Sequence, residues 1–175
     1  MGQRNYLVEG ASGTGKTTVC TELARRGFHA VHGDRELAYQ GDPVTGMRVE
    51  GVSHEHHVWD VGRVRALVDD RSEPVTFFCG GSRNVSAFLH LFDTVFVLDI
   101  DRTTLHERLS RRPAGEWGAE PAERELVLRL HDSGADVPTG IVIDATAPVG
   151  DVVDSILRRA VPPLRTGTAG SSTAS

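Results

Sequence analysis

The chain has 175 residues, 39% of them hydrophobic, and carries a net charge of −5. This composition supplies one apolar core, so residues 1–161 are predicted to form a single globular domain. The negative charge argues against a nucleic-acid surface, which normally shows a basic stripe, and no apolar run approaches the roughly 18 residues of a membrane span. We therefore expect neither nucleic acid nor a membrane as a partner.

The ends of the chain and its two cysteines bear on location. The N-terminus enters an apolar segment almost at once, which predicts no signal peptide. Cys20 and Cys79 fit neither a disulfide framework nor a zinc site, so we expect reduced thiols in the cytoplasm. Residues 162–175 are mostly small and polar and are predicted to be a disordered tail. Whether the domain is a monomer or a homodimer stays open.

Predicted strands and helices alternate along the chain. Apolar runs predict strands at 6–8, 28–32, 75–79, 94–98 and 140–143. Helical spacing predicts helices at 17–26, 35–39, 58–70, 86–91, 101–112 and 148–160, another begins at Pro121, and 41–57 is a polar stretch. Buried strands between helices indicate an α/β fold with a parallel sheet covered on both faces. In such sheets the ligand lies at the carboxyl ends of the strands.

Residues Gly10–Thr17 read Gly-Ala-Ser-Gly-Thr-Gly-Lys-Thr, a complete G-x-x-x-x-G-K-[ST] phosphate-binding loop between a strand and a helix. The backbone N–H groups of such a loop surround phosphates, and the helix N-terminus adds partial positive charge. A chance glycine-rich turn is the alternative, and the matching context disfavours it. The predicted nucleotide-binding residues are Gly10, Ala11, Ser12, Gly13, Thr14, Gly15, Lys16, Thr17, Thr18, Arg108 and, after the last strand, Ala147.

Lys16 is the only lysine among 19 lysines and arginines. A compact ammonium reaches the β- and γ-phosphates where a planar guanidinium fits poorly. The hydroxyl of Thr17 is predicted to bind Mg²⁺. The expected cofactors are therefore Mg²⁺ and ATP or GTP.

Asp34 follows the second predicted strand, 18 residues after Lys16. A carboxylate on the γ-phosphate side of the loop would accept a proton from an attacking hydroxyl. The alternative is that Asp34 caps the helix that follows, and both roles can hold together.

Arginines and histidines supply the remaining candidates. Arg108, Arg111 and Arg112 precede a loop rich in proline and glycine, and we expect them to close as a lid, at about 112–120, that neutralises charge on a transferred phosphoryl group. A surface helix with ordinary ion pairs is the alternative. Residues Ser53–His57 lack the spacing of a zinc site and are interpreted as part of an acceptor loop or as plain surface. The predicted acceptor-binding residues are Asp34, Arg35, Tyr39, His57 and Arg83.

Two rival classes are disfavoured by the sequence. A GTPase switch needs an Asn-Lys-x-Asp motif, which the chain lacks. A motor or AAA-type ATPase needs a longer chain and usually an acidic pair after an apolar strand, whereas Ile100 follows Asp99.

The order of loop, Asp34, Arg83, arginine-rich lid and final loop resembles the small P-loop kinases over residues 4–160. These include nucleoside and nucleotide kinases, shikimate kinase, gluconate kinase and chloramphenicol phosphotransferase. The resemblance implies a five-stranded parallel sheet of order 2-3-1-4-5, with Mg-ATP as donor. It also implies that Asp34 binds or deprotonates the acceptor and that Arg83 clamps it.

The chain departs from these kinases at two points. Cys79 stands where many of them carry an acidic residue that helps to hold Mg²⁺, and the Asp-Gly-x-Pro-Arg motif of nucleotide kinases is absent. The pattern looks closest to short proteins of high-GC bacteria labelled nucleoside kinases, and some nucleoside-antibiotic resistance phosphotransferases look similar.

The sequence therefore predicts a kinase that moves the γ-phosphoryl group of ATP or GTP to a hydroxyl of a small molecule, a nucleoside or a nucleoside-like compound such as an antibiotic. The alternatives are a metabolite kinase of the gluconate or shikimate type and a regulatory protein that binds nucleotide without transferring phosphate.

Overall fold

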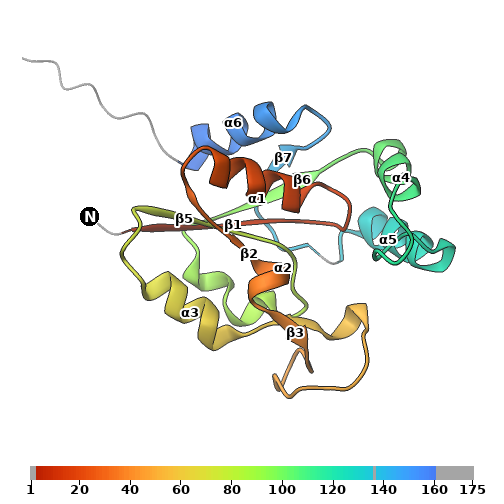
Figure 1. Ribbon diagram of the computed structural model, residues 1–175, viewed down its shortest axis with the longest axis horizontal. Coiled ribbons are helices and arrows are strands. Elements are labelled where there is room, and N and C mark those ends of the chain that lie inside the picture. The colour runs from red at the N-terminus through yellow and green to blue at the C-terminus, as the bar shows by residue number, and fades with distance from the viewer. Residues whose placement is uncertain (1–2, 136, 161–175) are drawn as a thin grey trace, which may run out of the picture.

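The computed structural model describes residues 3–135 and 137–160. Its main sheet has the order β2-β5-β1-β6-β7, and every neighbouring pair is parallel (Figure 1). Counted along the chain, this is the predicted order 2-3-1-4-5, so the predicted fold class is confirmed. The five strands are β1 (Arg4–Gly10), β2 (His29–His32), β5 (Val75–Cys79), β6 (Thr94–Asp99) and β7 (Ile141–Asp144).

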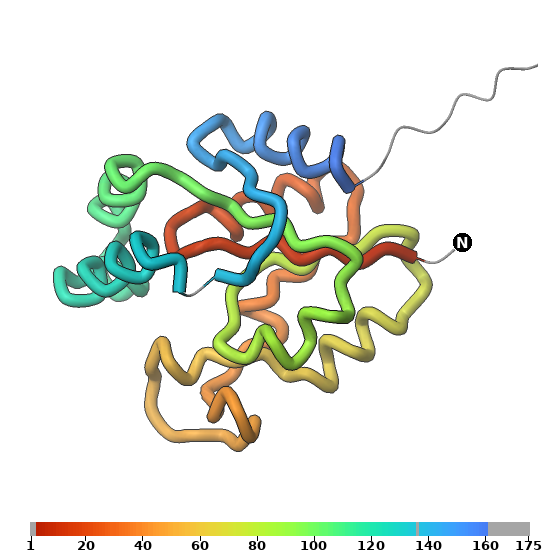
Figure 2. Tube along the Cα trace, turned by 180° about the vertical axis from the view of Figure 1, so that it is seen from behind, coloured from red at the N-terminus to blue at the C-terminus, as the bar shows by residue number. Residues whose placement is uncertain are grey.

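Helices cover both faces of the sheet. On one face lie α1 (Lys16–Arg25) and α6 (Val149–Ala160), and on the other lie α3 (Val61–Asp69) and two short 3₁₀ turns (Figure 1). Seen from behind, β7 forms the edge of the sheet beside β6 (Figure 2). Beyond the carboxyl ends of the strands, α4 (Arg102–Ser110) and α5 (Pro121–Ser133) pack against each other.

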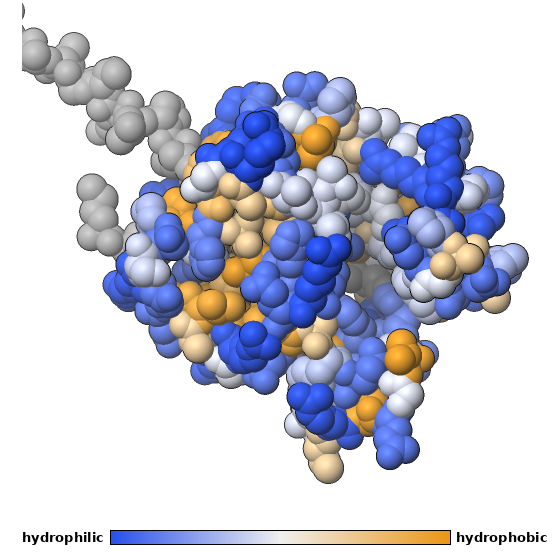
Figure 3. Space-filling view, viewed as in Figure 1, coloured by the Kyte–Doolittle hydropathy of each residue, from blue (hydrophilic) through white to orange (hydrophobic). Residues whose placement is uncertain are grey.

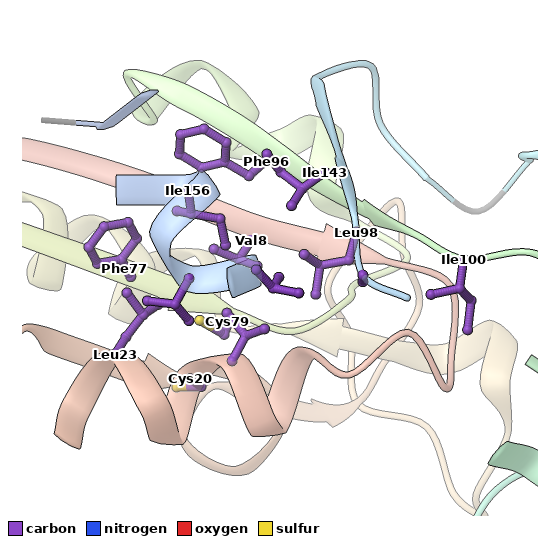
Figure 4. Close-up of a cluster of buried hydrophobic side chains, with 14 of the residues drawn as sticks. Val8, Cys20, Leu23, Phe77, Cys79, Phe96, Leu98, Ile100, Ile143 and Ile156 are labelled. Carbon is purple, nitrogen blue, oxygen red and sulfur yellow. The ribbon is translucent and has the colours of Figure 1, made fainter. Parts of the chain in front are cut away.

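The side chains of the central strands alternate between two cores. Tyr6, Val8 and Phe77 pack under α1 and α6, whereas Leu7 and Phe78 pack against α3. Both sets are buried, which explains why these strands read as continuous apolar runs. Figure 4 shows the first core, where the sulfur atoms of the two cysteines, both reduced, lie side by side between α1 and β5. Burial of each large apolar side chain stabilises the folded state by about 2 kcal/mol relative to leaving it in water.

The segment between β2 and α3 differs from its prediction. Residues 35–39 were expected to be helical, but α2 (Gly33–Glu36) ends early and β3 (Ala38–Gln40) pairs antiparallel with β4 (His57–Trp59). The pairing satisfies the backbone groups of both segments and buries Leu37 and Trp59, which outweighs a weak helical pattern. The hairpin β3–β4, with its connection 41–56, stands away from the sheet (Figures 1 and 2).

Two further helices begin or continue differently from the prediction. The helix expected from residue 58 begins at Val61, because the side chain of Asp60 accepts a hydrogen bond from the Arg63 N–H at 3.0 Å and caps it. In place of a helix over 86–91 there are two 3₁₀ turns, η2 (Val85–Ala87) and η3 (Leu89–Leu91). Phe88, with φ −135°, interrupts them because its ring is buried against Trp59, with the ring centroids 5.6 Å apart.

The predicted C-terminal tail lies outside the described residues. Within residues 3–135 and 137–160, no helix combines the length and the apolar character that crossing a membrane demands.

Candidate active site

The phosphate-binding loop has the backbone that its glycines permit. Gly10, Gly13 and Gly15 have positive φ angles of 153°, 90° and 102°. At Gly13 the φ of +90° disfavours any residue with a side chain, and a Cβ there would lie 2.7 Å from Leu105 Cδ1, so Leu105 would have to shift. Gly15 precedes α1 without a side-chain cap, which leaves the first N–H groups of the helix available to an anion.

A cavity of about 540 Å³ lies over this loop, and we call it the loop cavity. It contains most of the predicted nucleotide-binding residues. Its lining consists of Ser12, Gly13, Thr14, Gly15, Lys16, Thr17, Thr18, Val19, Asp34, Arg35, Arg108, Arg112, Glu116, Ala145, Ala147, Val149 and Val152.

A second cavity, of about 310 Å³, lies between the loop and the β3–β4 hairpin, and we call it the hairpin cavity. Figure 3 shows the surface hollowed between the hairpin and the α4–α5 pair. Ser12, Lys16 and Asp34 line both cavities, so they stand at the junction. The remaining lining is Glu9, Gly10, Ala11, Gln40, Val52, Ser53, His54, His57, Gly81, Ser82, Arg83 and Trp117.

The ammonium group of Lys16 is held at this junction by the loop itself. Its Nζ donates hydrogen bonds to the carbonyl oxygens of Gly10, at 2.5 Å, and Ala11, at 3.1 Å. Burial lowers the pKa of Lys16, and the negative charges of Asp34 and Glu9 oppose that shift. A phosphate group in the loop cavity would favour the charged ammonium further.

Asp34 is fixed by three hydrogen-bond donors. Its Oδ1 accepts from the Gly81 N–H at 3.1 Å, from His57 Nε2 at 3.2 Å and from Trp59 Nε1 at 3.4 Å. Burial opposes ionisation of Asp34, but the bond from His57 and the charge of Lys16 outweigh it, so the pKa lies below its ordinary value. His32 is the residue that precedes α2, so Asp34 lies inside that helix rather than at its cap.

The indole of Trp59 supports this arrangement from beneath. A Cβ at Gly33 would collide with the ring, and a Cβ at Gly80 would lie 2.6 Å from Trp59 Cζ2 and 2.6 Å from Asp34 Oδ1. The backbone of Trp59 exchanges buried hydrogen bonds with the side chain of Asn84, at 3.0 and 2.9 Å. The turns after β2 and β5 therefore close around one aromatic ring.

Glu9 is a site residue that the sequence reasoning missed. It ends the apolar part of β1, is 2% exposed and lines the hairpin cavity, yet no group among the described residues forms a hydrogen bond with its Oε2. Burial raises the pKa of Glu9 to about 8; Lys16 opposes the shift and Asp34 adds to it. A carboxylate directly before Gly10, at the end of a buried strand, was the available signal.

The structure separates the three lid arginines. Arg108 donates to the carbonyl oxygens of Thr14, at 3.2 Å, and Ala145, at 2.9 Å, and Arg112 donates to Ser12 Oγ at 3.2 Å. Both line the loop cavity, whereas Arg111 lines neither cavity. Two of the three arginines therefore reach the cavity over the phosphate-binding loop.

The predicted acceptor-binding residues also separate. His57 and Arg83 line the hairpin cavity, and Arg35 lines the loop cavity. Tyr39 lines neither: strand alternation turns Gln40 into the hairpin cavity and Tyr39 away, where its hydroxyl donates to the Gly46 carbonyl at 2.8 Å. Of the histidine-rich segment, His54 joins His57 at the cavity.

The donor set fits Mg²⁺ bound together with a nucleotide. Thr17 and Asp34 both line the loop cavity, and Mg²⁺ commonly takes one or two protein oxygens beside phosphates and water. Cys79, at the position where many small P-loop kinases carry a carboxylate, is buried in the core beside Cys20. Asp99 does not supply a carboxylate in place of Cys79, because Asp99 lines neither cavity and its Oδ1 lies 3.5 Å from His131 Nε2.

Comparison with known proteins places the chain in a family. A family model described as an AAA domain matches residues 7–129. The chain belongs to this family. The argument from chain length and from Ile100 against an AAA-type ATPase is therefore wrong for this family, whose domain fits a chain of this length. No curated protein sequence matches the chain.

Solved structures share the fold of this AAA-domain protein. A sugar kinase from Janibacter sp. is 19% identical with a TM-score of 0.58, over 91% of this chain and 96% of that chain. A gluconokinase from Sinorhizobium meliloti is 20% identical with a TM-score of 0.57, over 90% and 93%. A deoxyadenosine kinase from M. mycoides, with bound dATP, is 14% identical with a TM-score of 0.52, over 90% and 98%. The fold is that of the small P-loop kinases.

Proposed function

We propose that the protein transfers the γ-phosphoryl group of ATP or GTP to a hydroxyl group of a small molecule, a nucleoside or a nucleoside-like compound. The observation that carries this proposal is the position of Asp34 and Lys16, which line both the loop cavity and the hairpin cavity. A phosphoryl group that passes from the loop cavity to the hairpin cavity would pass beside Asp34 and Lys16.

The donor triphosphate would lie in the loop cavity. The N–H groups of the loop and of the start of α1 would bind its phosphates, with Lys16 between the two cavities. Thr17 and Asp34 would hold Mg²⁺, which neutralises phosphate charge when bound. Arg108 and Arg112 would stabilise the charge that spreads over the transferred oxygens.

The acceptor would lie in the hairpin cavity with its hydroxyl toward Asp34. The Asp34 carboxylate accepts a hydrogen bond from this hydroxyl, orients its oxygen toward the γ-phosphorus, and takes the proton as the new P–O bond forms and the bond to the β-phosphate oxygen breaks. Arg83 and the carboxyl group of Glu9 offer polar contacts to the remaining groups of the acceptor.

The lining supports a nucleoside-like acceptor. The hairpin cavity is lined by polar side chains, among them Glu9, Asp34 and Arg83, and by the rings of His54 and Trp117. A polyol attached to a flat ring matches both kinds of lining, and a nucleoside antibiotic is one such compound. The alternative is a gluconate-type acid: the gluconokinase and sugar kinase likenesses favour it, as does the cationic Arg83.

The test is a mass-spectrometric screen for phosphorylated product. Purified protein with Mg-ATP or Mg-GTP would meet nucleosides, nucleoside antibiotics, chloramphenicol, gluconate and shikimate, with Asp34→Asn as the control. We expect a single class of acceptor to gain a phosphate with the unmodified protein alone. Nucleotide binding and slow hydrolysis that no acceptor changes would instead favour a regulatory protein that binds nucleotide without transferring phosphate.

A further inference from the structure

The loop that joins α4 to α5, residues 111–120, reaches both cavities. Its neighbouring residues Glu116 and Trp117 lie on different sides: Glu116 lines the loop cavity and Trp117 lines the hairpin cavity. A lid over the nucleotide alone would not need a large aromatic ring in the other cavity.

Trp117 packs directly on the hairpin. Its indole is stacked on the imidazole ring of His54, with ring centroids 5.4 Å apart and planes 4° from parallel. This separation is typical of one direct pair and leaves no room for a third ring between them. A flat ligand that stacks on this face of Trp117 must therefore take the place of His54.

Within residues 3–135 and 137–160, the polar edge of the indole has no hydrogen-bond partner: Trp117 Nε1 is buried and donates to none of these residues. This is unfavourable for an indole N–H beside a cavity. A ligand that displaces His54 could supply an oxygen or nitrogen atom to this donor.

The backbone of Trp117 is held independently of its ring. The guanidinium group of Arg112 donates to the Trp117 carbonyl oxygen and also to Ser12 Oγ in the phosphate-binding loop. Gly118 follows with φ +89°, and a Cβ there would lie 3.0 Å from Arg112 Nη1. Substituting the Trp117 side chain should therefore leave the contact between the lid and the phosphate-binding loop in place.

We propose that Trp117 determines acceptor specificity: its indole stacks on a flat ring of the acceptor, in the place that His54 occupies here, and its Nε1 donates to that acceptor. This inference rests on the proposed function, since it assigns the hairpin cavity to the acceptor. It makes the lid loop part of the acceptor site as well as of the nucleotide site.

The first test compares Trp117→Leu and Trp117→Phe with the unmodified protein. The five common nucleosides serve as flat-ring acceptors and gluconate as an acceptor without a ring. We expect Trp117→Leu to raise KM for the nucleosides about 10-fold or more, as loss of one base–aromatic stack would. Trp117→Phe keeps a ring and should recover part of the loss. The Kd for ATP should stay within about twofold, because Arg112 bonds the backbone of residue 117.

The second test needs no turnover. Trp59 and Trp117 are the only tryptophans, so the difference in emission between the unmodified protein and Trp117→Phe reports on Trp117 alone. Titration with the nucleosides, without ATP, should change this difference saturably, and gluconate should not.

Nucleosides that leave the Trp117 emission unchanged would overturn the inference, as would a Trp117→Leu variant that loses ATP affinity while KM for the acceptor is unchanged. Failure of the proposed function gives a different result, namely saturable nucleoside binding at Trp117 with no phosphorylated product from any acceptor.

Discussion

The carboxylate of Asp34 accepts a 3.1 Å hydrogen bond from the backbone N–H of Gly81, a residue 47 positions further along the chain. The bond joins the turn after β2 to the turn after β5. The bonds from His57 and Trp59 reach the same oxygen, Oδ1, so Oδ2 is the oxygen left for Mg²⁺ or for an acceptor hydroxyl.

Asp34→Asn should abolish transfer while nucleotide binding persists. The amide oxygen can still accept from Gly81, so the local structure should survive, but an amide cannot take the proton of the acceptor hydroxyl. We expect kcat to fall about 10²- to 10⁴-fold, with the Kd for ATP, measured without Mg²⁺ because Asp34 would also bind that ion, within about twofold. Steady-state kinetics and a fluorescent-nucleotide titration measure the two quantities; near-normal kcat would remove Asp34 from the proton-accepting role.

Lys16→Arg should weaken triphosphate binding although it preserves the charge. The ammonium group lies between two loop carbonyl oxygens, and a planar guanidinium does not fit that position. We expect the Kd for ATP to rise about 10-fold or more, an effect of about 1.4 kcal/mol. The reverse exchange Arg25→Lys, at an exposed residue at the end of α1, is the matched control and should bind ATP normally. Equal Kd values for both variants would count against the role given to Lys16.

Substituting the lid arginines one at a time should give unequal losses. Arg108→Ala and Arg112→Ala each remove a guanidinium group from the loop cavity, and we expect kcat to fall about 100-fold or more. Arg111 lies in the same turn of chain but outside both cavities, so the fall in kcat of Arg111→Ala should be at least about 10-fold smaller. Measuring kcat under saturating substrates ranks the three variants. An Arg111→Ala variant as impaired as the other two would contradict the position of Arg111 outside both cavities.

In the unmodified protein, Glu9 should make the free energy of unfolding fall as the pH rises. Glu9→Gln should remove this fall. The pKa of Glu9 is about 8 in the folded protein, against an ordinary value of 4.5. Between these values the folded state keeps a proton that the unfolded state releases, so the free energy of unfolding falls as the pH rises through this window.

The measurement is the melting temperature between about pH 5 and 8, roughly the span of that window. As the pH rises, it should fall more steeply for the unmodified protein than for Glu9→Gln. The exposed Glu107→Gln variant is the control and should follow the unmodified protein. Parallel curves for the unmodified protein and Glu9→Gln would show that the Glu9 carboxyl is not protonated in the fold.

The main sheet was predictable because its signals are local. Each strand is a short apolar run, and the glycine loop marks where the first strand meets the first helix. The β3–β4 hairpin was missed because its two strands have three residues each and lie 16 residues apart, with pairing that depends on tertiary contacts. Tyr39 was assigned to the wrong side for the same reason, since only the pairing register decides which residue faces the cavity.

The site was predictable where a motif or the end of a strand marks it. Lys16, Asp34 and Arg83 were found because each follows a strand of a parallel sheet, and they line a cavity in the structure. Glu9 and Trp117 were missed because their significance comes from burial and from a stacking partner in another loop. The sequence could not show which of the three lid arginines enters the loop cavity. The end of a helix cannot be located to the residue from sequence, so the directions of Arg108, Arg111 and Arg112 relative to the cavity stay undetermined.

The ring of Trp59, filling the space beside Gly33 and Gly80, ties three distant positions to one shared volume. Neither glycine can gain a side chain while this ring is present. Across evolution, we expect a side chain to be gained at position 33 only in sequences where position 59 has already become small, whereas position 80 is also closed by Asp34 Oδ1 and by its φ of +153°. Such paired replacement, traced through a phylogeny, would record the history of this site independently of its chemistry.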